Sequence, residues 1–590
     1  MKTSKNFARV AVTAGLTAAM ALGNVVAPAA MVLAADAGST VTFEDAGYAA
    51  STTYKGIQIF KATVAAAGGA TTVSSIEWAS DAAKAAVVAA IQAKEPGYTS
   101  ENAQDAVDWL NANAGVSGTG SMVASDNVLS AIAANLNGNG DWKTTAAGDA
   151  SLSGLEAGYW LFLTATAGTP DGKSTDAFTS PVYAVIDGVS ATTVRPKKGV
   201  PTVEKKILDD ADAAGADIKG SDNWKDVADS QIDQEVNYRL TGTIASNYAT
   251  FDAYAYKFTD ELSAGLDYVD GSVEVCALNG GAYTTIDADK YDVAWTNNTL
   301  TVEFKVGDGK KGLKDVAGVD ANTRIVVFYK AKLNGNAVIG NAAEGNKGGN
   351  PNTVKLEYSN NPYAEGTGET IEDTVADFAF KLNLNKVDQG TEKGLAGAVF
   401  TIQSADANTK DQYVASKADA AANVVAGQLV TVADAKNLPD YVKFTSNAEG
   451  KIAVSGLDAG SYKVAEVQTP DDTKYTKANP FTFTITPTYD ETAMKMTGLT
   501  AAVSEADKGR SDIAFGTLDG TAGDNKLTGT NGTGTDAATG EVTINVGNTK
   551  SVGLPITGLN GVTLTWVAGG AVLVIGVAHL IRSRREESEE

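Results

Sequence analysis

Residues 378–388, FAFKLNLNKVD, alternate apolar and polar side chains, and this period of two predicts a β-strand with one buried face. Residues two apart in a strand share a face, so Lys386 follows four apolar residues toward the interior. The same count places Asn548 on the apolar face of EVTINVGN and Glu466 on the apolar face of SYKVAEV. We therefore expect a lysine, an asparagine and a glutamate on the buried sides of three strands.

An earlier part of the chain repeats this arrangement. Lys205 lies on the apolar face of PTVEKKI, Asp260 on that of YAYKFTD and Asn352 on that of NPNTVKLEY. Which lysine and which asparagine belong together stays open, because Lys206 is the direct neighbour of Lys205. Asn350 also lies on the same strand face as Asn352. Two successive blocks of the chain thus carry the same three residue types.

Charged groups on a buried face have a chemical consequence. An unpaired ammonium or carboxylate is costly to bury, and both groups respond by becoming neutral. A neutral lysine amine is a nucleophile, and a protonated carboxylic acid can polarise an amide carbonyl. Lysine, asparagine and acid in a dry core can then condense into an amide with loss of ammonia. A buried salt bridge, or a lysine whose tip reaches solvent, fits the same periodicity.

The sequence as a whole predicts a mainly β protein. Its 590 residues exceed what one core usually serves, and its short strands with frequent turns favour tandem immunoglobulin-like β-sandwich domains. The expected segments are a signal peptide (1–35), an N-terminal domain of mixed strands and helices (36–195), a middle sandwich domain (196–370), a C-terminal sandwich domain (371–552) and an anchoring segment (553–590).

Helices are expected in the N-terminal domain. Strands are predicted at 54–64 and 157–167 by their β-branched and aromatic residues. Between them, three stretches of helix-forming residues each open with a serine that can act as the N-cap, at Ser80, Ser100 and Ser125.

The composition excludes several kinds of function. The formal net charge of −24 argues against a nucleic-acid partner. Cys276 is the only cysteine and His579 the only histidine, which excludes most metal and thiol chemistry. Each of the two also fits an ordinary buried position. We expect no cofactor, no metal site and no enzymatic activity on external substrates.

One end of the chain carries a predicted export signal, and the other carries a predicted membrane span. Basic residues, an apolar stretch and small residues predict a secretory signal cleaved near Ala35. The apolar run Val562–Ile581 is about 30 Å long as a helix, enough to cross a bilayer, and arginines follow it at 582, 584 and 585. A buried helix is the other interpretation of this run.

The motif LPITG, formed by Leu554, Pro555, Ile556, Thr557 and Gly558, stands directly before that run. Motif, apolar span and arginines together resemble the LPXTG cell-wall sorting signal of Gram-positive surface proteins. The resemblance implies that the transpeptidase sortase cuts between the threonine and the glycine and passes the threonine carbonyl to an amine. The membrane span then holds the precursor only until it is processed.

The rest of the chain, before this sorting signal, resembles a major (backbone) pilin of sortase-assembled Gram-positive pili. Residues 444–475 are similar to the collagen-binding-protein B-type (CnaB-like) domain, with an E-box at Tyr462, Glu466 and Pro470, although the usual glycine before the final tyrosine is replaced in DDTKY. KFTDELSAGLDY and NPNTVKLEYSNNP resemble the middle domain of the same pilins.

This resemblance implies autocatalytic isopeptide bonds. By position they are assigned as follows: Lys205 to Asn352 promoted by Asp260, and Lys386 to Asn548 promoted by Glu466, each joining the first strand of its domain to the last. The region SPVYAVIDGVSATTV of the first domain contains no asparagine, and we expect no such bond there.

The resemblance also implies a lysine that accepts the incoming threonine. TTVRPKKG resembles the pilin motif V-Y-P-K and offers Lys197, with Arg195 where tyrosine is usual and without an upstream tryptophan; Lys198 is the rival. A Thr557-to-Lys197 linkage would carry tension from 197 to 557 and leave the first domain outside the load path.

The expected function is that of a major pilus subunit, anchored to the cell wall, with a role in adhesion. Expected partners are sortase, identical subunits, minor pilins, peptidoglycan and a host or extracellular-matrix ligand. A monomeric wall-anchored adhesin is the alternative. A surface hydrolase using Asp260 and Glu466 as paired carboxylates is disfavoured, because the two lie in different predicted domains.

Overall fold

The computed structural model describes residues 38–45, 47–67, 70–115, 122–213, 217–341, 348–516, 535–536 and 538–550. The predicted signal peptide, the LPITG motif with Leu554, Pro555, Thr557 and Gly558, the apolar run and the arginines after it lie outside the described residues. Within the described part of the chain, no helix is long and apolar enough to cross a membrane.

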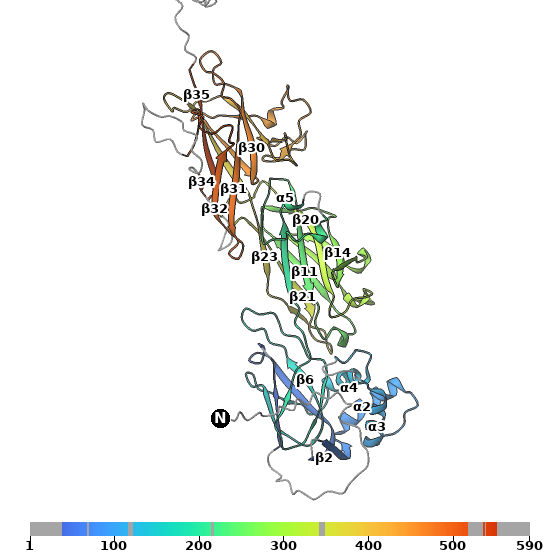
Figure 1. Cartoon of the computed structure of the whole chain (residues 1–590). Helices are drawn as coiled ribbons and strands as arrows, with labels where there is room; N and C mark the ends of the chain where they lie inside the picture. Colours follow the sequence, from blue (N-terminus) through green and yellow to red (C-terminus); the bar gives the residue numbers. More distant parts are fainter. Residues whose placement is uncertain are drawn as a thin grey trace, which may run out of the picture.

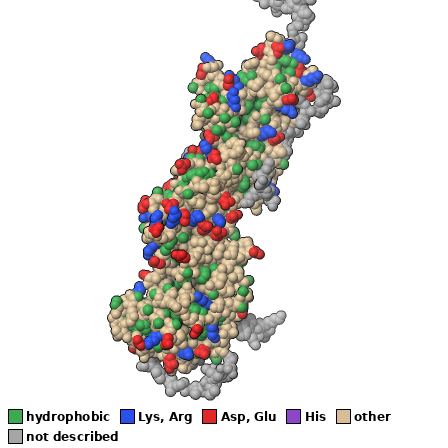
Figure 2. Space-filling model, turned by 180° about the vertical axis from the view of Figure 1, so that it is seen from behind, with side chains coloured by type: hydrophobic (Ala, Val, Ile, Leu, Met, Phe, Trp, Pro, Cys, Tyr) green, Lys and Arg blue, Asp and Glu red, His purple; other side chains and the backbone are tan. Residues whose placement is uncertain are grey.

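The molecule is elongated and mainly β, as expected. Three β-rich bodies follow one another in chain order along its length, and the helices α2, α3 and α4 lie beside the first (Figure 1). We call them the N-terminal region (residues 38–198), the central sandwich (β9 to β23) and the C-terminal sandwich (β24 to β35). On the face seen in Figure 2, acidic and basic side chains are interspersed along the molecule.

The N-terminal region packs two sheets and three helices around its cores. One sheet has the order β5-β1-β8 and the other β3-β2-β6-β7, with β4 paired to β2. The elements are β1 (Ser39–Phe43), β2 (Thr53–Ala67), β3 (Ala70–Trp78), α2 (Asp81–Lys94), α3 (Ala103–Asn113), α4 (Val128–Asn137), β4 (Lys143–Thr144), β5 (Ser151–Leu155), β6 (Gly158–Thr166), β7 (Val182–Ile186) and β8 (Thr192–Val194).

The three helices begin at side-chain caps, but only one of the predicted serines is a cap. Ser80 accepts from the Ala83 amide and caps α2, as predicted. The prediction was wrong for α3 and α4, which begin two residues later than expected and are capped by Asn102 and Asn127. The asparagine side chain reaches the amide two residues on, which satisfies an otherwise unpaired N–H of the first turn.

The central sandwich packs two antiparallel-rich sheets face to face. One sheet has the order β15-β14-β20-β11-β9, and the other β10-β23-β21-β12-β17-β16. The strands are β9 (Val203–Leu208), β10 (Val227–Asp229), β11 (Glu235–Thr243), β12 (Tyr256–Leu262), β13 (Leu266–Tyr268), β14 (Glu274–Asn279), β15 (Ala282–Thr285), β16 (Asp292–Thr296), β17 (Thr299–Phe304), β18 (Val306–Gly307), β19 (Lys310–Lys311), β20 (Arg324–Leu333), β21 (Asn350–Ser359), β22 (Thr367–Glu369) and β23 (Asp373–Phe378); the short helix α5 is Asp210–Ala213.

The C-terminal sandwich also has two sheets, in the orders β29-β24-β35-β33 and β27-β26-β25-β30-β31-β32. Its strands are β24 (Phe380–Asp388), β25 (Val399–Ser404), β26 (Tyr413–Val414), β27 (Leu429–Val430), β28 (Phe444–Thr445), β29 (Lys451–Leu457), β30 (Gly460–Gln468), β31 (Phe481–Asp490), β32 (Lys495–Val503), β33 (Ile513–Phe515), β34 (Thr535–Asp536) and β35 (Glu541–Asn548). β24 and β35 are parallel neighbours, so the beginning and the end of this sandwich lie side by side.

Candidate functional site

A lysine and an asparagine meet between β24 and β35 in the C-terminal sandwich. The parallel register sets Lys386 opposite Val546 and Asp388 opposite Asn548. Lys386 Nζ donates one hydrogen bond to Asn548 Oδ1 and a second of 3.1 Å to the Val546 carbonyl. Lys386 is 0% exposed and Asn548 1%, so the amine and the amide face each other without access to water.

The carboxyl of Glu466 reaches this pair from β30 in the facing sheet. Glu466 Oε1 accepts a hydrogen bond of 3.0 Å from Asn548 Nδ2 and lies 3.8 Å from Lys386 Nζ. Its other oxygen, Oε2, accepts from the Ala478 amide at 2.6 Å. The acid is therefore held in place by the backbone while it contacts the amide nitrogen.

Burial changes the protonation of both ionisable groups in this site. It lowers the pKa of Lys386 to about 8, although Glu466 opposes the shift. Burial likewise raises the pKa of Glu466, although Lys386 opposes that shift. The two pKa values move toward each other, so burial favours the neutral amine and the protonated acid.

The central sandwich brings together the second set of predicted residues. Lys205 lies on β9 in one sheet, while Asp260 on β12 and Asn352 on β21 lie on adjacent strands of the other. All three side chains are 0% exposed. Burial lowers the pKa of Lys205 to about 8 and raises the pKa of Asp260.

A tyrosine that the sequence analysis missed joins these three residues. Lys205 Nζ donates to Asp260 Oδ1 and, at 2.9 Å, to the hydroxyl of Tyr329 on β20. That hydroxyl donates to Asp260 Oδ2 at 2.5 Å and accepts from Asn352 Nδ2 at 2.7 Å. A signal did exist, because the alternation within RIVVFYKAKL places Tyr329 on the apolar face of its strand.

The alternative lysine and asparagine have other partners. Lys206 Nζ donates to Asp226 at 2.5 Å, and the Lys206 side chain is 23% exposed. Asn350 accepts from the Val338 amide at 2.8 Å and donates to the carbonyls of Val338 and Asp377. This geometry favours Lys205 and Asn352 as the members of the central site.

One topological expectation was wrong for the central sandwich. Asn352 lies on β21, which is followed by β22 and β23 in the same sheet, so its strand is not the last. The reason is that the segment after β21 folds back beside it and continues the sheet before the chain enters β24. In the C-terminal sandwich, β35 is the last described strand, as expected.

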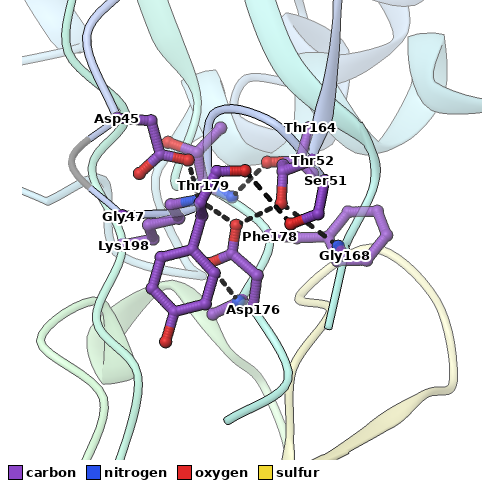
Figure 3. A network of polar contacts seen from close by, with 12 residues as sticks. Asp45, Gly47, Ser51, Thr52, Thr164, Gly168, Asp176, Phe178, Thr179 and Lys198 are labelled. Carbon is purple, nitrogen blue, oxygen red and sulfur yellow. Dashed lines mark hydrogen bonds and ion pairs between the residues drawn. The ribbon is translucent and has the colours of Figure 1, made fainter. Parts of the chain in front are cut away.

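Lys198, the rival for the acceptor lysine, lies in an enclosed ion cluster of the N-terminal region (Figure 3). Its Nζ donates to Asp45 Oδ2 at 2.7 Å, to Asp176 Oδ2 and, at 3.1 Å, to the Tyr54 hydroxyl. The Lys198 side chain is only 6% exposed. Thr52 donates to Asp176 at 2.6 Å, and burial raises the pKa of Asp176.

Lys197 is fixed through its backbone. Its amide donates to Thr179 Oγ1 at 2.7 Å, and its carbonyl accepts from the Ser180 amide at 2.7 Å. The residue is half-buried, and burial lowers the pKa of its side chain. Both lysines therefore lie on a segment that is anchored to the N-terminal region.

Asp260 and Glu466 lie in the cores of different sandwiches, beside the clusters that contain Phe258 and Val464 respectively. They do not form a paired-carboxylate site. Among the residues that the structure describes, no group of three or more histidine, cysteine or acidic side chains is arranged to hold a metal ion. Cys276 is a buried free thiol.

Two parts of the chain match known protein families. Residues 232–362 match the Gram-positive pilin backbone subunit 2, Cna-B-like domain, and residues 380–499 match the SpaA prealbumin-like fold domain. The class that fold and matches define is thus a tandem β-sandwich chain, of which one segment is similar to a Gram-positive pilin backbone domain. The Cna-B-like match thus falls in the central sandwich, whereas the C-terminal segment that resembles a CnaB-like domain in sequence, residues 444–475, lies within the match to the SpaA prealbumin-like fold domain.

The solved structures that match this chain include three pilins from different bacteria. The T6 backbone pilin of Streptococcus pyogenes has 15% identity and a TM-score of 0.48, over 88% of this chain and 100% of that one. The major pilin SpaD of Corynebacterium diphtheriae has 14% identity and a TM-score of 0.41, over 87% and 98%. BcpA, the major pilin subunit of Bacillus cereus, has 18% identity and a TM-score of 0.36, over 69% and 89%. A sequence comparison with curated proteins finds no match.

Proposed function

We propose that this chain is the major structural subunit of a covalently polymerised pilus on a Gram-positive cell surface. One observation carries the proposal: a lysine, a carboxyl and an asparagine are grouped in the dry core of two successive sandwiches. The central sandwich includes the segment that matches the Gram-positive pilin backbone domain, and the C-terminal sandwich includes the segment that matches the SpaA prealbumin-like fold domain. A structural role, with no catalysis on external substrates, follows from this combination.

Each group of three residues forms an intramolecular isopeptide bond in this proposal. The neutral lysine attacks the amide carbon of the asparagine, ammonia leaves, and the acid promotes the exchange. The two bonds join Lys205 to Asn352, promoted by Asp260, and Lys386 to Asn548, promoted by Glu466. They give a secreted chain with a single cysteine a covalent reinforcement that a disulfide within the chain cannot supply.

Sortase joins the subunits in this proposal. It recognises the motif with Leu554 and Pro555, cuts after Thr557, discards Gly558 and the residues beyond it, and transfers the threonine carbonyl to Lys197 of the next subunit. Tension along the fibre then enters at 197 and leaves at 557. Minor pilins, peptidoglycan at the base and a host or extracellular-matrix ligand are the further partners.

The enclosed position of Lys198 supports Lys197 as the acceptor. A nucleophilic amine must meet the acyl-enzyme as a free base, whereas the Lys198 amine is enclosed with two carboxylates. Removing Lys198 would leave those carboxylates without their cation. A substitution test therefore needs a variant that keeps the charge.

Lysine-to-arginine variants provide this test, because arginine retains the charge but does not accept the acyl group. We expect wall extracts of cells expressing the wild-type chain to give an SDS-resistant ladder. Lys197→Arg should abolish the ladder, and Lys198→Arg should retain it. A ladder that survives Lys197→Arg and disappears with Lys198→Arg would reverse the assignment, and a wild-type chain found only as a wall-anchored monomer would contradict the pilus itself.

A further inference from the structure

The Tyr329 hydroxyl lies between the two reacting groups of the central sandwich. We propose that Tyr329 is a catalytic proton relay in the formation of the Lys205–Asn352 bond, passing a proton from Asp260 to the nitrogen that leaves Asn352. This inference rests on the proposed function, because it assumes that the bond forms.

The contacts form a continuous path. Lys205 Nζ donates to Asp260 Oδ1, while the Tyr329 hydroxyl contacts the other oxygen, Oδ2, at 2.5 Å. The same hydroxyl lies 2.7 Å from Asn352 Nδ2. The two oxygens of one carboxyl therefore serve different partners: Oδ1 meets the attacking amine, and Oδ2 meets the hydroxyl that contacts the leaving nitrogen.

The proton movements balance along this path. The Lys205 ammonium first gives one proton to the Tyr329 hydroxyl while the hydroxyl's own proton passes to Asp260 Oδ2, leaving a neutral amine and a carboxylic acid protonated on Oδ2. The amine forms a new C–N bond to Asn352 Cγ, and its second proton passes to Asp260 Oδ1. Asp260 Oδ2 gives its proton to Tyr329, whose own proton goes to the Asn352 nitrogen. The old C–N bond breaks, ammonia leaves, and Asp260 ends in the protonated form from which it began the attack.

The Tyr329 hydroxyl is suited to passing a proton on rather than to remaining ionised. The residue is 1% exposed, and burial raises the pKa of Tyr329 well above its usual value, so the hydroxyl remains protonated. A neutral hydroxyl both donates and accepts, which a relay requires. It also holds the Asn352 side chain through Nδ2, while Asn352 Oδ1 has no hydrogen-bond partner among the described residues.

The C-terminal sandwich shows why a relay is specific to the central one. There, Glu466 Oε1 contacts the leaving nitrogen of Asn548 directly, at 3.0 Å. In the central sandwich, the hydroxyl of Tyr329 occupies the position between the carboxyl and the leaving nitrogen. The two bonds therefore differ in their requirement for a tyrosine.

Tyr329→Phe in the full chain tests the relay, with Tyr238→Phe as the matched control. Tyr238 stacks on Tyr329 with ring centroids 5.2 Å apart, and its buried hydroxyl has no hydrogen-bond partner among the described residues. The measurement is the fraction of each crosslinked peptide pair, by mass spectrometry, at intervals after synthesis. We expect Tyr329→Phe to slow the Lys205–Asn352 bond by on the order of 100-fold, the usual contribution of a general acid. The Lys386–Asn548 bond should form at the wild-type rate in the same molecules.

The outcomes separate the relay from the proposed function. Equal rates in wild type and Tyr329→Phe would overturn the relay alone, and a wild-type chain without the central bond would overturn the crosslink on which it rests. Should Tyr329→Phe fail to fold, a ring-fluorinated tyrosine at position 329 keeps the ring and the hydroxyl but makes the phenol more acidic. The relay predicts a changed rate and pH profile for that chain, and an unchanged rate and profile would overturn it.

Discussion

Asn548 Nδ2 donates a hydrogen bond of 3.0 Å to Glu466 Oε1 across the two sheets of the C-terminal sandwich. The oxygen of the same amide accepts from Lys386 Nζ. The amine thus lies at the carbonyl side of the amide and the acid at its nitrogen side. This is the division of roles that an exchange of one amine for another requires.

Glu466→Gln should prevent the Lys386–Asn548 bond, because glutamine keeps the shape of the side chain but cannot supply a proton. The deficit of the intact mass against the mass of the translated sequence should be smaller in the variant than in wild type by one ammonia. The loop is 162 residues long, so loss of the bond should lower stability by about 5 kcal/mol on the loop-entropy model, or about 15 °C in Tm. The exposed Glu505→Gln is the control, and a Glu466→Gln chain that still carries the bond would exclude the glutamate as its promoter.

Asn352→Ala and Asn350→Ala should separate the two candidate asparagines of the central sandwich. Asn352→Ala should abolish the bond to Lys205. Asn350→Ala should destabilise the fold by about 1–3 kcal/mol, because it leaves buried backbone groups of Val338 and Asp377 unpaired, yet retain the bond. Peptide mass spectrometry identifies the joined residues, and a bond that is lost with Asn350 and kept without Asn352 would refute the assignment.

Lys198→Met should destabilise the N-terminal region by about 3–5 kcal/mol, because it leaves Asp45 and Asp176 buried without their cation. Lys84→Met is the control, since Lys84 forms a surface pair with Glu101 that contributes about 1 kcal/mol or less. Urea unfolding monitored in this region measures the difference. Equal effects of the two substitutions would contradict a stabilising role for the enclosed ion cluster.

A group of carboxyls lies where the central and C-terminal sandwiches meet. Asp229 on β10 accepts from the Tyr489 hydroxyl at 2.8 Å and from the Ala459 amide at 3.0 Å. Burial raises the pKa of Asp209 to about 6 and raises the pKa of Asp229 and Asp458. Each carboxyl is therefore more easily protonated in the folded chain than in the unfolded one.

This group predicts a stability that decreases as pH rises. Since the folded pKa exceeds the unfolded value, the contribution to stability is complete below about pH 4 and is lost as pH rises through the folded pKa, near 6 for Asp209. Asp458→Asn should raise Tm at pH 8 by about 3 °C, the effect of one kcal/mol in a domain of this size, with a smaller change at pH 5.

Asp471→Asn is the control for this pH dependence, since the Asp471 side chain is partly exposed. Lys474 and Thr473 lower the pKa of Asp471 to about 2, so it stays ionised over the tested range. Thermal unfolding at pH 5 and pH 8 is the measurement. A Tm of Asp458→Asn that falls equally at both pH values would show that the carboxyl stabilises the joint through hydrogen bonding alone.

The strand-borne residues of both sites could be located from the sequence because the period of a strand is a local property. Lys386 and Asn548 follow apolar residues at every second position, and the structure buries both. The role of Tyr329 could not be found in this way. A tyrosine on an apolar face is ordinary, and its contact with Asp260 depends on how two sheets pack, which is not encoded within one strand.

The environment of Lys198 was equally inaccessible from the sequence. In the sequence, Asp45 is 153 positions away from Lys198 and Asp176 is 22 positions away. Neither aspartate belongs to a strand with a regular pattern. Similarly, Ser100 and Ser125 each lie two residues before the asparagine that caps the helix. The asparagine two positions later matched the first turn better.

The most direct test of the account is the intact mass of a purified, folded chain spanning residues 36–557. Two intramolecular isopeptide bonds predict a mass lower than that of the translated sequence by two ammonia molecules, about 34 Da. Proteolytic peptides should then show Lys205 joined to Asn352 and Lys386 joined to Asn548. A chain with the full translated mass would contradict the account, since the buried lysines would then be ion-paired rather than covalently bonded.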